Sequence, residues 1–267
     1  MRRIRDREGD RDRERTPTHS HVILNAPTHL SPVPFLPCSL SPLRPCLRGT
    51  LRAMRRELLS KEGREIRGMF GRIAHRYDLL NRVLSVGRDV AWRRAIARRL
   101  AATGAELVLD VCTGTGDVAL AINGSQVIGA DFCLPMLDLA QSKAASSGRR
   151  LPLLAADALQ LPVDSASVDA VTVAFGVRNF SNLDSGLAEL ARVLRPGGTL
   201  LVLEFSHPKG VLAPLLGWWV RVVPPRVGRW LSGDPEAYAY LPASVSTFPE
   251  SGAMCRRMQN AGLGRVV

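Results

Sequence analysis

The sequence predicts one doubly wound α/β domain, in which a mainly parallel sheet is covered by helices on both faces and is preceded by a helical lead-in. Five short runs rich in aliphatic and β-branched residues predict its strands. These runs are apolar on both faces, as is typical of the buried strands of a parallel sheet. Amphipathic segments separate them, so strand and helix alternate along the chain. The 267 residues are 46% hydrophobic and 22% charged, which is ordinary globular composition.

The elements of this core follow in chain order. The predicted strands cover residues 106–112, 127–131, 151–156, 168–175 and 199–205. Helices are predicted over 134–147 and 184–194, and a shorter helix follows the first strand and its glycines. The run Pro196-Gly197-Gly198 predicts a turn before the fifth strand, and residues 264–267 predict the beginning of a sixth.

A helical cap is predicted in front of the core. Apolar residues recur at helical spacing over about 58–74, 77–84 and 90–100, and Gly87 separates the last two groups. We therefore expect three helices in an N-terminal cap over residues 54–104, followed by the core over residues 105–267.

The first 53 residues differ from the rest of the chain. Arg2–Arg15 alternates arginine with acidic residues, and six prolines follow within Pro27–Pro45. Such a stretch builds neither a helix nor a paired strand, so we expect residues 1–53 to be a disordered extension. Its acidic residues argue against a mitochondrial transit peptide, and its prolines argue against a secretory signal. On one interpretation Met54 is the true start of the protein.

Charge and cysteine content narrow the class of protein. The net charge is +12, and 13 of the 36 basic residues lie within residues 55–99. A basic segment suits nucleic acid, an anionic membrane surface or an anionic substrate, and charge alone does not choose between them. The five cysteines form no CxxC pair, which indicates neither a zinc ribbon nor a disulfide framework. We therefore expect a cytoplasmic protein without a metal. No apolar run reaches the roughly 18 residues that a membrane-spanning helix needs.

Three predicted strand ends carry residues suited to a ligand, and ligands of an open parallel sheet bind at the carboxyl ends of its strands. The first end leads into Gly114 and Gly116, which let a ligand approach the backbone at the start of a helix. Asp131 ends the second strand, where a carboxylate accepts hydrogen bonds from a ribose diol. Asp157 ends the third, where a carboxylate meets an adenine amino group. Together these residues predict a site for an adenosine-containing ligand.

The charges around the glycine loop favour a cationic cofactor. The loop lacks the GxGxxG spacing of nicotinamide-cofactor sites. Asp117 follows the second glycine directly and Asp110 lies on the preceding strand, and two carboxylates here repel a pyrophosphate. S-adenosylmethionine carries a sulfonium and an ammonium group and no phosphate. We therefore predict S-adenosylmethionine as the cofactor, with Asp110, Gly114, Gly116 and Asp131 among the residues that bind it.

Six segments carry a family resemblance. They are MFGRIAHRYDLLN (Met69–Asn81), LDVCTGTGD (Leu109–Asp117), ADFCLPML (Ala130–Leu137), AFGVRNF (Ala174–Phe180), RVLRPGGTLLVLEFS (Arg192–Ser206) and AYAYLPASVSTFP (Ala237–Pro249). Through them residues 64–263 resemble the ubiquinone/menaquinone biosynthesis C-methyltransferases of the UbiE type, which are class I methyltransferases with a Rossmann-like fold. The glycine loop and RPGG are generic to class I enzymes, whereas YDxxN, FGxRN and LEFS are specific to this family. The resemblance implies cofactor contacts by Thr115, Asp131, Asp157 and Ala158.

The resemblance also implies an activity, the transfer of a methyl group to a ring carbon of an isoprenoid quinol. A ring carbon is a poor nucleophile until the neighbouring hydroxyl loses proton character, so the site needs a group that stabilises the oxyanion. Arg178 is the candidate for that role, Asn179 for orienting a ring oxygen, and Tyr77 for a catalytic residue on the cap.

Other cap and strand-end residues are candidates for the substrate pocket, namely Asp78, Asn81 and Phe175. Structural alternatives stand beside these roles. Tyr77 suits a packed aromatic, Asp78 with Asn81 suits a cap on a following helix, and Arg178 suits an ion pair with an acid at the end of the sheet.

We expect demethylmenaquinol as the substrate, because AFGVRNF resembles the menaquinone branch more than the FGLRN form of ubiquinone-making relatives. The alternatives are a demethylubiquinol-type substrate (a 2-methoxy-polyprenyl-benzoquinol), another small molecule, or a non-catalytic protein that binds S-adenosylmethionine. We do not expect nucleic acid as a partner. No Asn-Pro-Pro-Tyr-type motif follows the fourth strand, and aromatic residues are only 5% of the chain.

Two expectations concern the C-terminal part. Residues 208–231 combine aliphatic side chains with three tryptophans and three arginines, which suits a membrane interface. We expect a lid insertion over residues 207–243 that contacts the inner face of the cell membrane, and the alternative is an insertion that packs in the core. Class I methyltransferases normally add a sixth and an antiparallel seventh strand. The resemblance therefore implies that the C-terminal strands are truncated and that the fifth strand has an unpaired edge.

Overall fold

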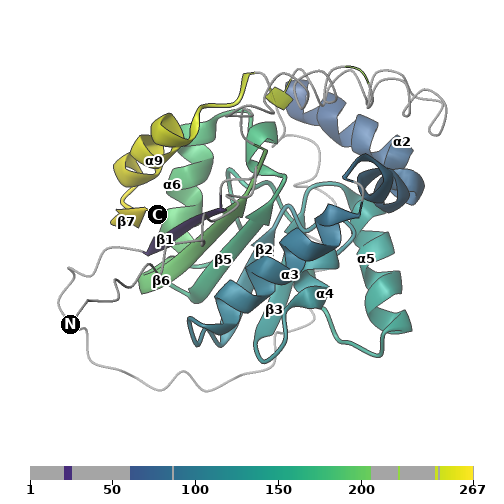
Figure 1. Ribbon diagram of the computed structural model, residues 1–267, viewed down its shortest axis with the longest axis horizontal. Helices are drawn as coiled ribbons and strands as arrows, with labels where there is room; N and C mark the ends of the chain where they lie inside the picture. The colour runs from purple at the N-terminus through teal and green to yellow at the C-terminus, as the bar shows by residue number, and fades with distance from the viewer. Residues whose placement is uncertain are drawn as a thin grey trace, which may run out of the picture.

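The computed structural model describes residues 21–25, 61–85, 87–205, 222, 244, 245 and 247–266. These residues form a seven-stranded sheet in the order β4-β3-β2-β5-β6-β1-β7, with helices on both faces (Figure 1). Neighbouring strands from β4 to β6 run parallel, whereas β1 is antiparallel to both of its neighbours. The doubly wound α/β fold with a mainly parallel sheet is therefore confirmed.

The five predicted core strands are all present, with bounds that differ by a few residues. They are β2 (Leu107–Val111), β3 (Gln126–Asp131), β4 (Leu153–Ala155), β5 (Val168–Ala174) and β6 (Leu194–Leu203). The turn predicted at 196–198 is instead an irregularity within β6. The register with β5 passes from Val168↔Leu194 to Ala170↔Thr199, so extra residues of β6 bulge from the ladder.

The helices follow the predicted order, with one correction in the cap. They are α2 (Lys61–Leu84), α3 (Arg88–Ala101), α4 (Asp117–Ala121), α5 (Leu134–Ser146), α6 (Leu183–Val193) and α9 (Ser251–Asn260), with a 3-10 turn, η1 (Val177–Asn179). The helices expected over 58–74 and 77–84 are joined in α2, because neither His75 nor Arg76 breaks a helix. The break at Gly87 is confirmed, since Gly87 caps α3 with φ 74°.

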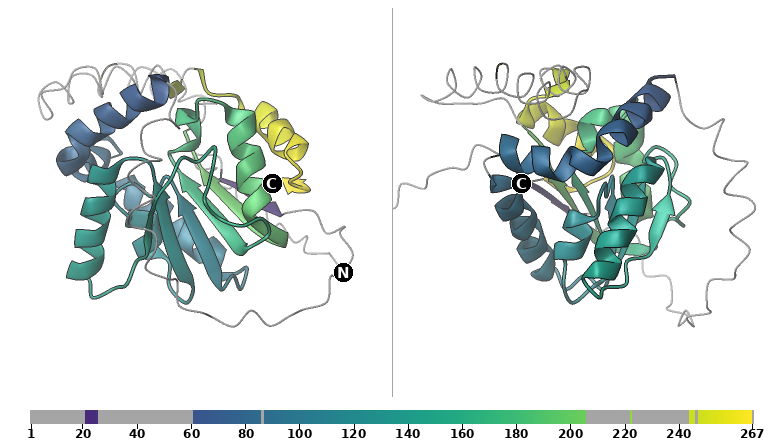
Figure 2. Two further views of the ribbon diagram at one scale, coloured as in Figure 1. Left: turned by 180° about the vertical axis from the view of Figure 1, so that it is seen from behind. Right: turned by 90° about the vertical axis from the view of Figure 1, so that its right-hand side faces the viewer.

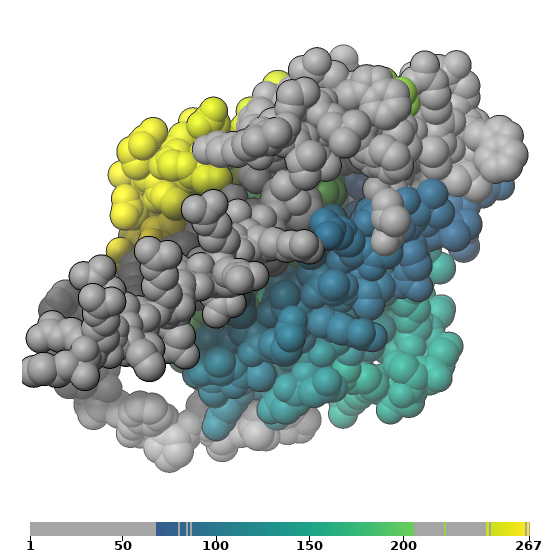
Figure 3. Space-filling model, in the orientation of Figure 1, coloured from purple at the N-terminus to yellow at the C-terminus, as the bar shows by residue number. Residues whose placement is uncertain are grey.

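Two apolar clusters lie on opposite faces of the sheet and explain how the layers form. Successive residues of each strand alternate between them, so Val108 belongs to one cluster and Leu109 to the other. One cluster joins the sheet to α3 and α4, and the other joins it to α6 and α9. Figure 2 shows these two layers of helices from behind and from the side. On the face seen in Figure 3, the surface of α2 and α3 (blue) adjoins that of α4 and α5 (teal).

The outer edge of the sheet corrects two predictions. The prediction that residues 1–53 lie outside the fold is wrong for β1 (His21–Asn25), which pairs with β6 from His21↔Leu203 to Asn25↔Thr199. The expected open edge of the fifth core strand is therefore occupied. The beginning of a further strand at the C-terminus is confirmed as β7 (Arg265–Val266), which pairs with β1. The run Val-Ile-Leu has high β propensity, and the free edge of a sheet accepts such a run.

Several expectations lie outside the described residues. They concern the rest of the extension (1–20 and 26–53) and, apart from Val222, the lid insertion over 207–243. Within the part of the chain that is described, no helix combines the length and the apolar character that crossing a bilayer requires.

Candidate active site

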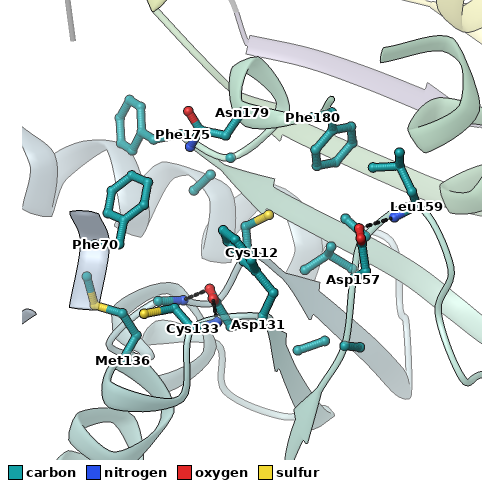
Figure 4. A pocket seen from close by; sticks show the side chains of 18 of the residues that line it. Phe70, Cys112, Asp131, Cys133, Met136, Asp157, Leu159, Phe175, Asn179 and Phe180 are labelled. Carbon is teal, nitrogen blue, oxygen red and sulfur yellow. Dashed lines mark hydrogen bonds between the residues drawn. The ribbon is translucent and has the colours of Figure 1, made fainter. Parts of the chain in front are cut away.

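A pocket lies at the carboxyl ends of the parallel strands, beneath α2 (Figure 4). Its walls come from the ends of β2 to β5, from the start of α5 and from η1, while α2 contributes Phe70 and Tyr77. Seven predicted site residues meet there, namely Tyr77, Gly114, Asp131, Asp157, Ala158, Phe175 and Asn179. A smaller adjoining pocket adds Asp110 and Thr115. The other predicted site residues, Gly116, Asp78, Asn81 and Arg178, line neither of these two pockets.

Asp131 is the buried carboxylate at the end of β3. One of its oxygens accepts a hydrogen bond from the Gly114 N–H at 2.8 Å, and the other accepts one from the Cys133 N–H at 2.8 Å. Burial raises the pKa of Asp131 to about 6, although these backbone hydrogen bonds favour the charged form. Each oxygen keeps a lone pair for a further donor, so the carboxylate is held in place to accept two hydroxyl groups.

The glycine loop is held from below by Asp110. One carboxylate oxygen accepts a hydrogen bond from the Thr113 hydroxyl at 2.7 Å, and the other accepts one from the Thr172 hydroxyl at 2.5 Å. Burial raises the pKa of Asp110 to about 6. Gly116 has φ 81°, and a Cβ atom there would lie 3.1 Å from the Cβ of Ala140 on α5. Asp110 therefore anchors the loop, and Gly116 lets α5 approach it.

The sequence suggested that Asp117, at the start of α4, is available to attract a cationic cofactor. In the structure its carboxylate is already paired with two cationic side chains. Its two oxygens pair with Arg93 at 2.5 Å and with Lys143 at 2.6 Å. The attraction expected between this carboxylate and a cationic cofactor is therefore largely offset by the two cations.

Asp157 and Ala158 form the side of the pocket across from α2. The Asp157 carboxylate accepts a hydrogen bond from the Leu159 N–H at 2.9 Å, and Ala158 is buried. Figure 4 shows Phe70 and Met136 on one side of Asp131 and Asp157 on the other. Between these carboxylates the wall is largely apolar, which suits a flat heterocyclic ring.

The end of β5 turns sharply to reach η1. Cys112 and Phe175, on neighbouring strand ends, have φ 56° and 57°, which is uncommon for residues other than glycine and is concentrated at functional sites. Gly176 is required between them, because a Cβ atom there would lie 2.4 Å from the Cβ of Cys112. The glycine of the FGxRN segment therefore allows two strand ends to close on each other.

Arg178 forms an ion pair with Glu204 at the end of β6, and both side chains are buried. The structural alternative for Arg178 was an ion pair with an acid at the end of the sheet, and Glu204 is such an acid. The guanidinium carbon lies 5.9 Å from the centre of the Phe175 ring and 5.5 Å from that of Phe205. Its Nε–H is buried and has no hydrogen-bond partner among the described residues. Arg178 therefore keeps one unpaired donor directly beside the pocket residue Asn179.

Tyr77 reaches the pocket from α2. Its ring packs edge-on to Phe70, with centroids 5.9 Å apart. Burial raises the pKa of Tyr77 above its ordinary value, while a hydrogen bond with Asn81 and the charge of Arg178 act in the opposite direction. The helix-cap alternative for Asp78 and Asn81 is wrong, because both residues lie inside α2.

Sequence reasoning missed several of the apolar residues that line the pocket, among them Phe70, Met136 and Phe180. Phe70 had a usable signal, since it precedes Tyr77 by seven residues and so shares its helix face. Among the described residues, no group of three or more histidine, cysteine or carboxylate side chains is placed to hold a metal ion.

The comparisons with known proteins agree with this geometry. A sequence model of the ubiE/COQ5 methyltransferase family matches residues 58–267. The chain belongs to this family. It is 46% identical over 206 residues to a demethylmenaquinone methyltransferase of Deinococcus radiodurans, covering 75% of this chain and 86% of that protein. It is 45% identical over 211 residues to a ubiquinone/menaquinone biosynthesis C-methyltransferase UbiE of Syntrophotalea carbinolica, covering 77% and 89%.

Solved structures support the fold of this ubiE/COQ5 family member. A SAM-dependent methyltransferase of Thermotoga maritima, titled a possible histamine N-methyltransferase, superposes with a TM-score of 0.51 at 17% identity, covering 73% of this chain and 80% of that one. Membership of this family makes the protein a methyltransferase whose cofactor is S-adenosylmethionine. The described site fits this cofactor, because Asp131 offers a fixed acceptor pair, the wall between Asp131 and Asp157 is largely apolar, and none of the described residues that line the main pocket is a lysine or arginine that could bind a phosphate.

Proposed function

We propose that this ubiE/COQ5 family member methylates a ring carbon of a demethylated isoprenoid quinol, and that its substrate is demethylmenaquinol. The observation that carries the proposal is the similarity, at 46% identity, to two proteins named demethylmenaquinone methyltransferase, from Deinococcus radiodurans and Thermus thermophilus. The aromatic wall of the pocket supports it. Phe70, Tyr77, Phe175 and Phe180 surround a space that suits a flat aromatic ring.

The residues of the site have separate tasks in this proposal. S-adenosylmethionine supplies the methyl group, which Asp131 positions by accepting hydrogen bonds from the ribose diol. Tyr77, which donates through its hydroxyl group, and Asn179 orient the ring oxygens, since both residues line the pocket. Arg178, next to Asn179, stabilises the ring oxygen as it loses its proton, and the donor assigned to this role is its Nε–H, which has no partner among the described residues. Walls that exclude water strengthen these interactions.

The quinol form of the substrate is expected to be methylated, and the quinone form is not. Only a hydroxyl on the ring can release a proton and push electron density onto the carbon that attacks the methyl group. The measurement is methyl transfer from labelled S-adenosylmethionine to demethylmenaquinone, with and without a chemical reductant under anaerobic conditions. Equal rates for the oxidised and the reduced ring would contradict the electronic argument.

A benzoquinol of the ubiquinone branch is the second candidate substrate, because the relative from Syntrophotalea carbinolica is named for both branches. Supplying the reduced 2-methoxy-polyprenyl-benzoquinol in the same assay separates the two. A higher kcat/KM for the naphthoquinol supports demethylmenaquinol, and the opposite order assigns the enzyme to the ubiquinone branch.

We also propose that the enzyme reaches its greasy substrate by reversible contact with the inner face of the cell membrane. Leu79 and Val83 lie one turn apart on α2 with 56% and 44% of their surface exposed, and the exposed Arg76 and Arg82 flank them. The same helix carries Tyr77 into the pocket. An apolar pair among arginines suits an anionic lipid surface.

Co-sedimentation with vesicles tests this contact. The full chain is expected to bind vesicles that contain phosphatidylglycerol, less so as salt rises, and the double variant Leu79→Ser, Val83→Ser is expected to bind several-fold less. The matched control is Ala145→Ser on the exposed side of α5. A second double variant, Trp218→Ser with Trp219→Ser, probes the segment outside the described residues. If both double variants stay folded and bind as the parent does, the membrane contact is wrong.

A further inference from the structure

A polar network behind the glycine loop joins four helices, and neither the cofactor nor the proposed reaction accounts for it. Asp78 comes from α2, Arg93 from α3, Asp117 from the start of α4 and Lys143 from α5. Arg93 links Asp117, at 2.5 Å, to Asp89 of its own helix, at 2.9 Å. Asp78 and Lys143 of this network also contact Thr115 of the glycine loop.

Lys143 is the centre of this network. Its ammonium nitrogen lies 2.5 Å from an oxygen of Asp78, 2.6 Å from an oxygen of Asp117 and 2.9 Å from the Thr115 hydroxyl. An ammonium group has three N–H donors, so all three are used. The Thr115 hydroxyl in turn donates to the other oxygen of Asp78 at 2.7 Å. Lys143, Asp78 and Thr115 thus form a closed ring of interactions that ties α2 to the loop.

The helix that this ring holds has its described buried apolar residues in the part that precedes Tyr77. Among the described elements, α2 packs mainly against α5 and α3. It buries Met69, Ile73 and Ala74, and Ala74 packs with Cys133 and Met136. Because Asp78 follows Tyr77 directly, the position of Asp78 sets how Tyr77 enters the pocket. The polar connection at Asp78 therefore holds the part of α2 that follows these buried residues, where Leu79 and Val83 are exposed.

Lys143 separates two negatively charged groups, the carboxylates of Asp78 and Asp117. Asp78 and Asp117 both lie within 2.6 Å of its nitrogen, so without Lys143 two carboxylates from different helices face each other across the loop. Arg93 also pairs with Asp117, but it is shared with Asp89 of its own helix. Loss of Lys143 therefore repels α2 from α4, rather than merely removing an attraction.

We propose that Lys143 is a positioning residue, which couples the placement of α2 and Tyr77 to the cofactor loop through Asp78 and Thr115. On this view cofactor binding and closure of α2 over the pocket stabilise each other. The role in turnover rests on the proposed function, but the coupling itself concerns only S-adenosylmethionine and α2.

The test compares Lys143→Met with Arg150→Met, an exposed cation just after α5 whose removal changes the net charge equally. Calorimetry gives the affinity for S-adenosylmethionine, and amide hydrogen exchange gives the protection of residues 68–84 relative to the core strands. Lys143→Met is expected to weaken the cofactor about tenfold and to raise exchange in α2 alone. Arg150→Met is expected to match the parent, and Lys143→Arg to restore most of the affinity.

A double variant separates positioning from a simple loss of stability. If repulsion between carboxylates causes the defect, Asp78→Asn added to Lys143→Met removes that repulsion and recovers part of the cofactor affinity. Without recovery, or with exchange in α2 equal to that of the Arg150→Met control, the proposal is overturned. These readouts use no quinol, so their failure is distinguishable from failure of the proposed substrate, which appears as normal binding without methyl transfer.

Discussion

Asp131→Ala is expected to weaken S-adenosylmethionine binding about 100-fold, which is the loss of two hydrogen bonds to a charged acceptor in a buried site. The variant also leaves the Gly114 and Cys133 N–H groups without their partner, so the loop loses its fixed shape. Calorimetry on the full chain measures the effect, with Asp138→Ala on the exposed side of α5 as the control. Equal affinity in Asp131→Ala and parent would remove Asp131 from the site.

The same residue gives the cofactor affinity a dependence on pH. The pKa of Asp131 in the free protein is about 6, raised by burial, and only the carboxylate form accepts two hydroxyl hydrogen bonds. Affinity is therefore expected to be constant above about pH 7 and to fall as pH drops through 6. Asp131→Asn has no such proton, so it is expected to bind weakly and with a smaller dependence on pH, the remainder coming from Asp110 beneath the loop, whose pKa is also about 6. A parent whose affinity is flat between pH 5 and 8 would contradict the assignment.

Arg178→Lys is expected to lower kcat about 100-fold while cofactor affinity changes by less than about twofold. Lysine keeps the positive charge next to Glu204, but it has neither the planar fork nor the Nε–H, which no described residue pairs with. Steady-state kinetics with the reduced substrate and calorimetry with the cofactor give the two numbers. The control is Arg192→Lys, which alters an ion pair with Glu189 on α6, away from the pocket.

The buried ion pair also makes a stability measurement informative. Glu204→Gln leaves the Arg178 charge buried without its partner, which costs about 3–5 kcal/mol in comparable cases. If Arg178→Lys lowers the melting temperature as strongly as Glu204→Gln does and leaves kcat unchanged, Arg178 is only the structural partner of Glu204. The oxyanion role is then wrong.

Much of the fold could be predicted because its signals are local. Apolar strands alternate with amphipathic helices, and Gly87 marks the break in the N-terminal cap at which α3 begins. Asp131 and Asp157 were found for a related reason, since the end of a parallel strand fixes the edge at which a side chain lies. A position in sequence is sufficient for such residues.

The remaining features depend on contacts between distant segments. The sequence shows that Asp117 follows the glycine loop, but not which residues pair with its carboxylate, because Arg93 and Lys143 come from two other helices. The Arg178–Glu204 pair follows from the register of β5 and β6, which places Ala174 beside Leu203 and so brings the residues after each strand together. The sequence around neither Arg178 nor Glu204 indicates how β5 and β6 are aligned.

The position of β1 affects the order in which the molecule can be completed. Leu24 pairs with Leu200 of β6, about 176 positions later, so β1 is synthesised well before the strand whose edge it covers. Closing so long a loop has an entropic cost that only the finished core can offset. Until then the outer side of β6 is a free edge, open to pairing with another nascent chain. Slow docking of β1 therefore lengthens the time for which the edge of β6 is open to aggregation.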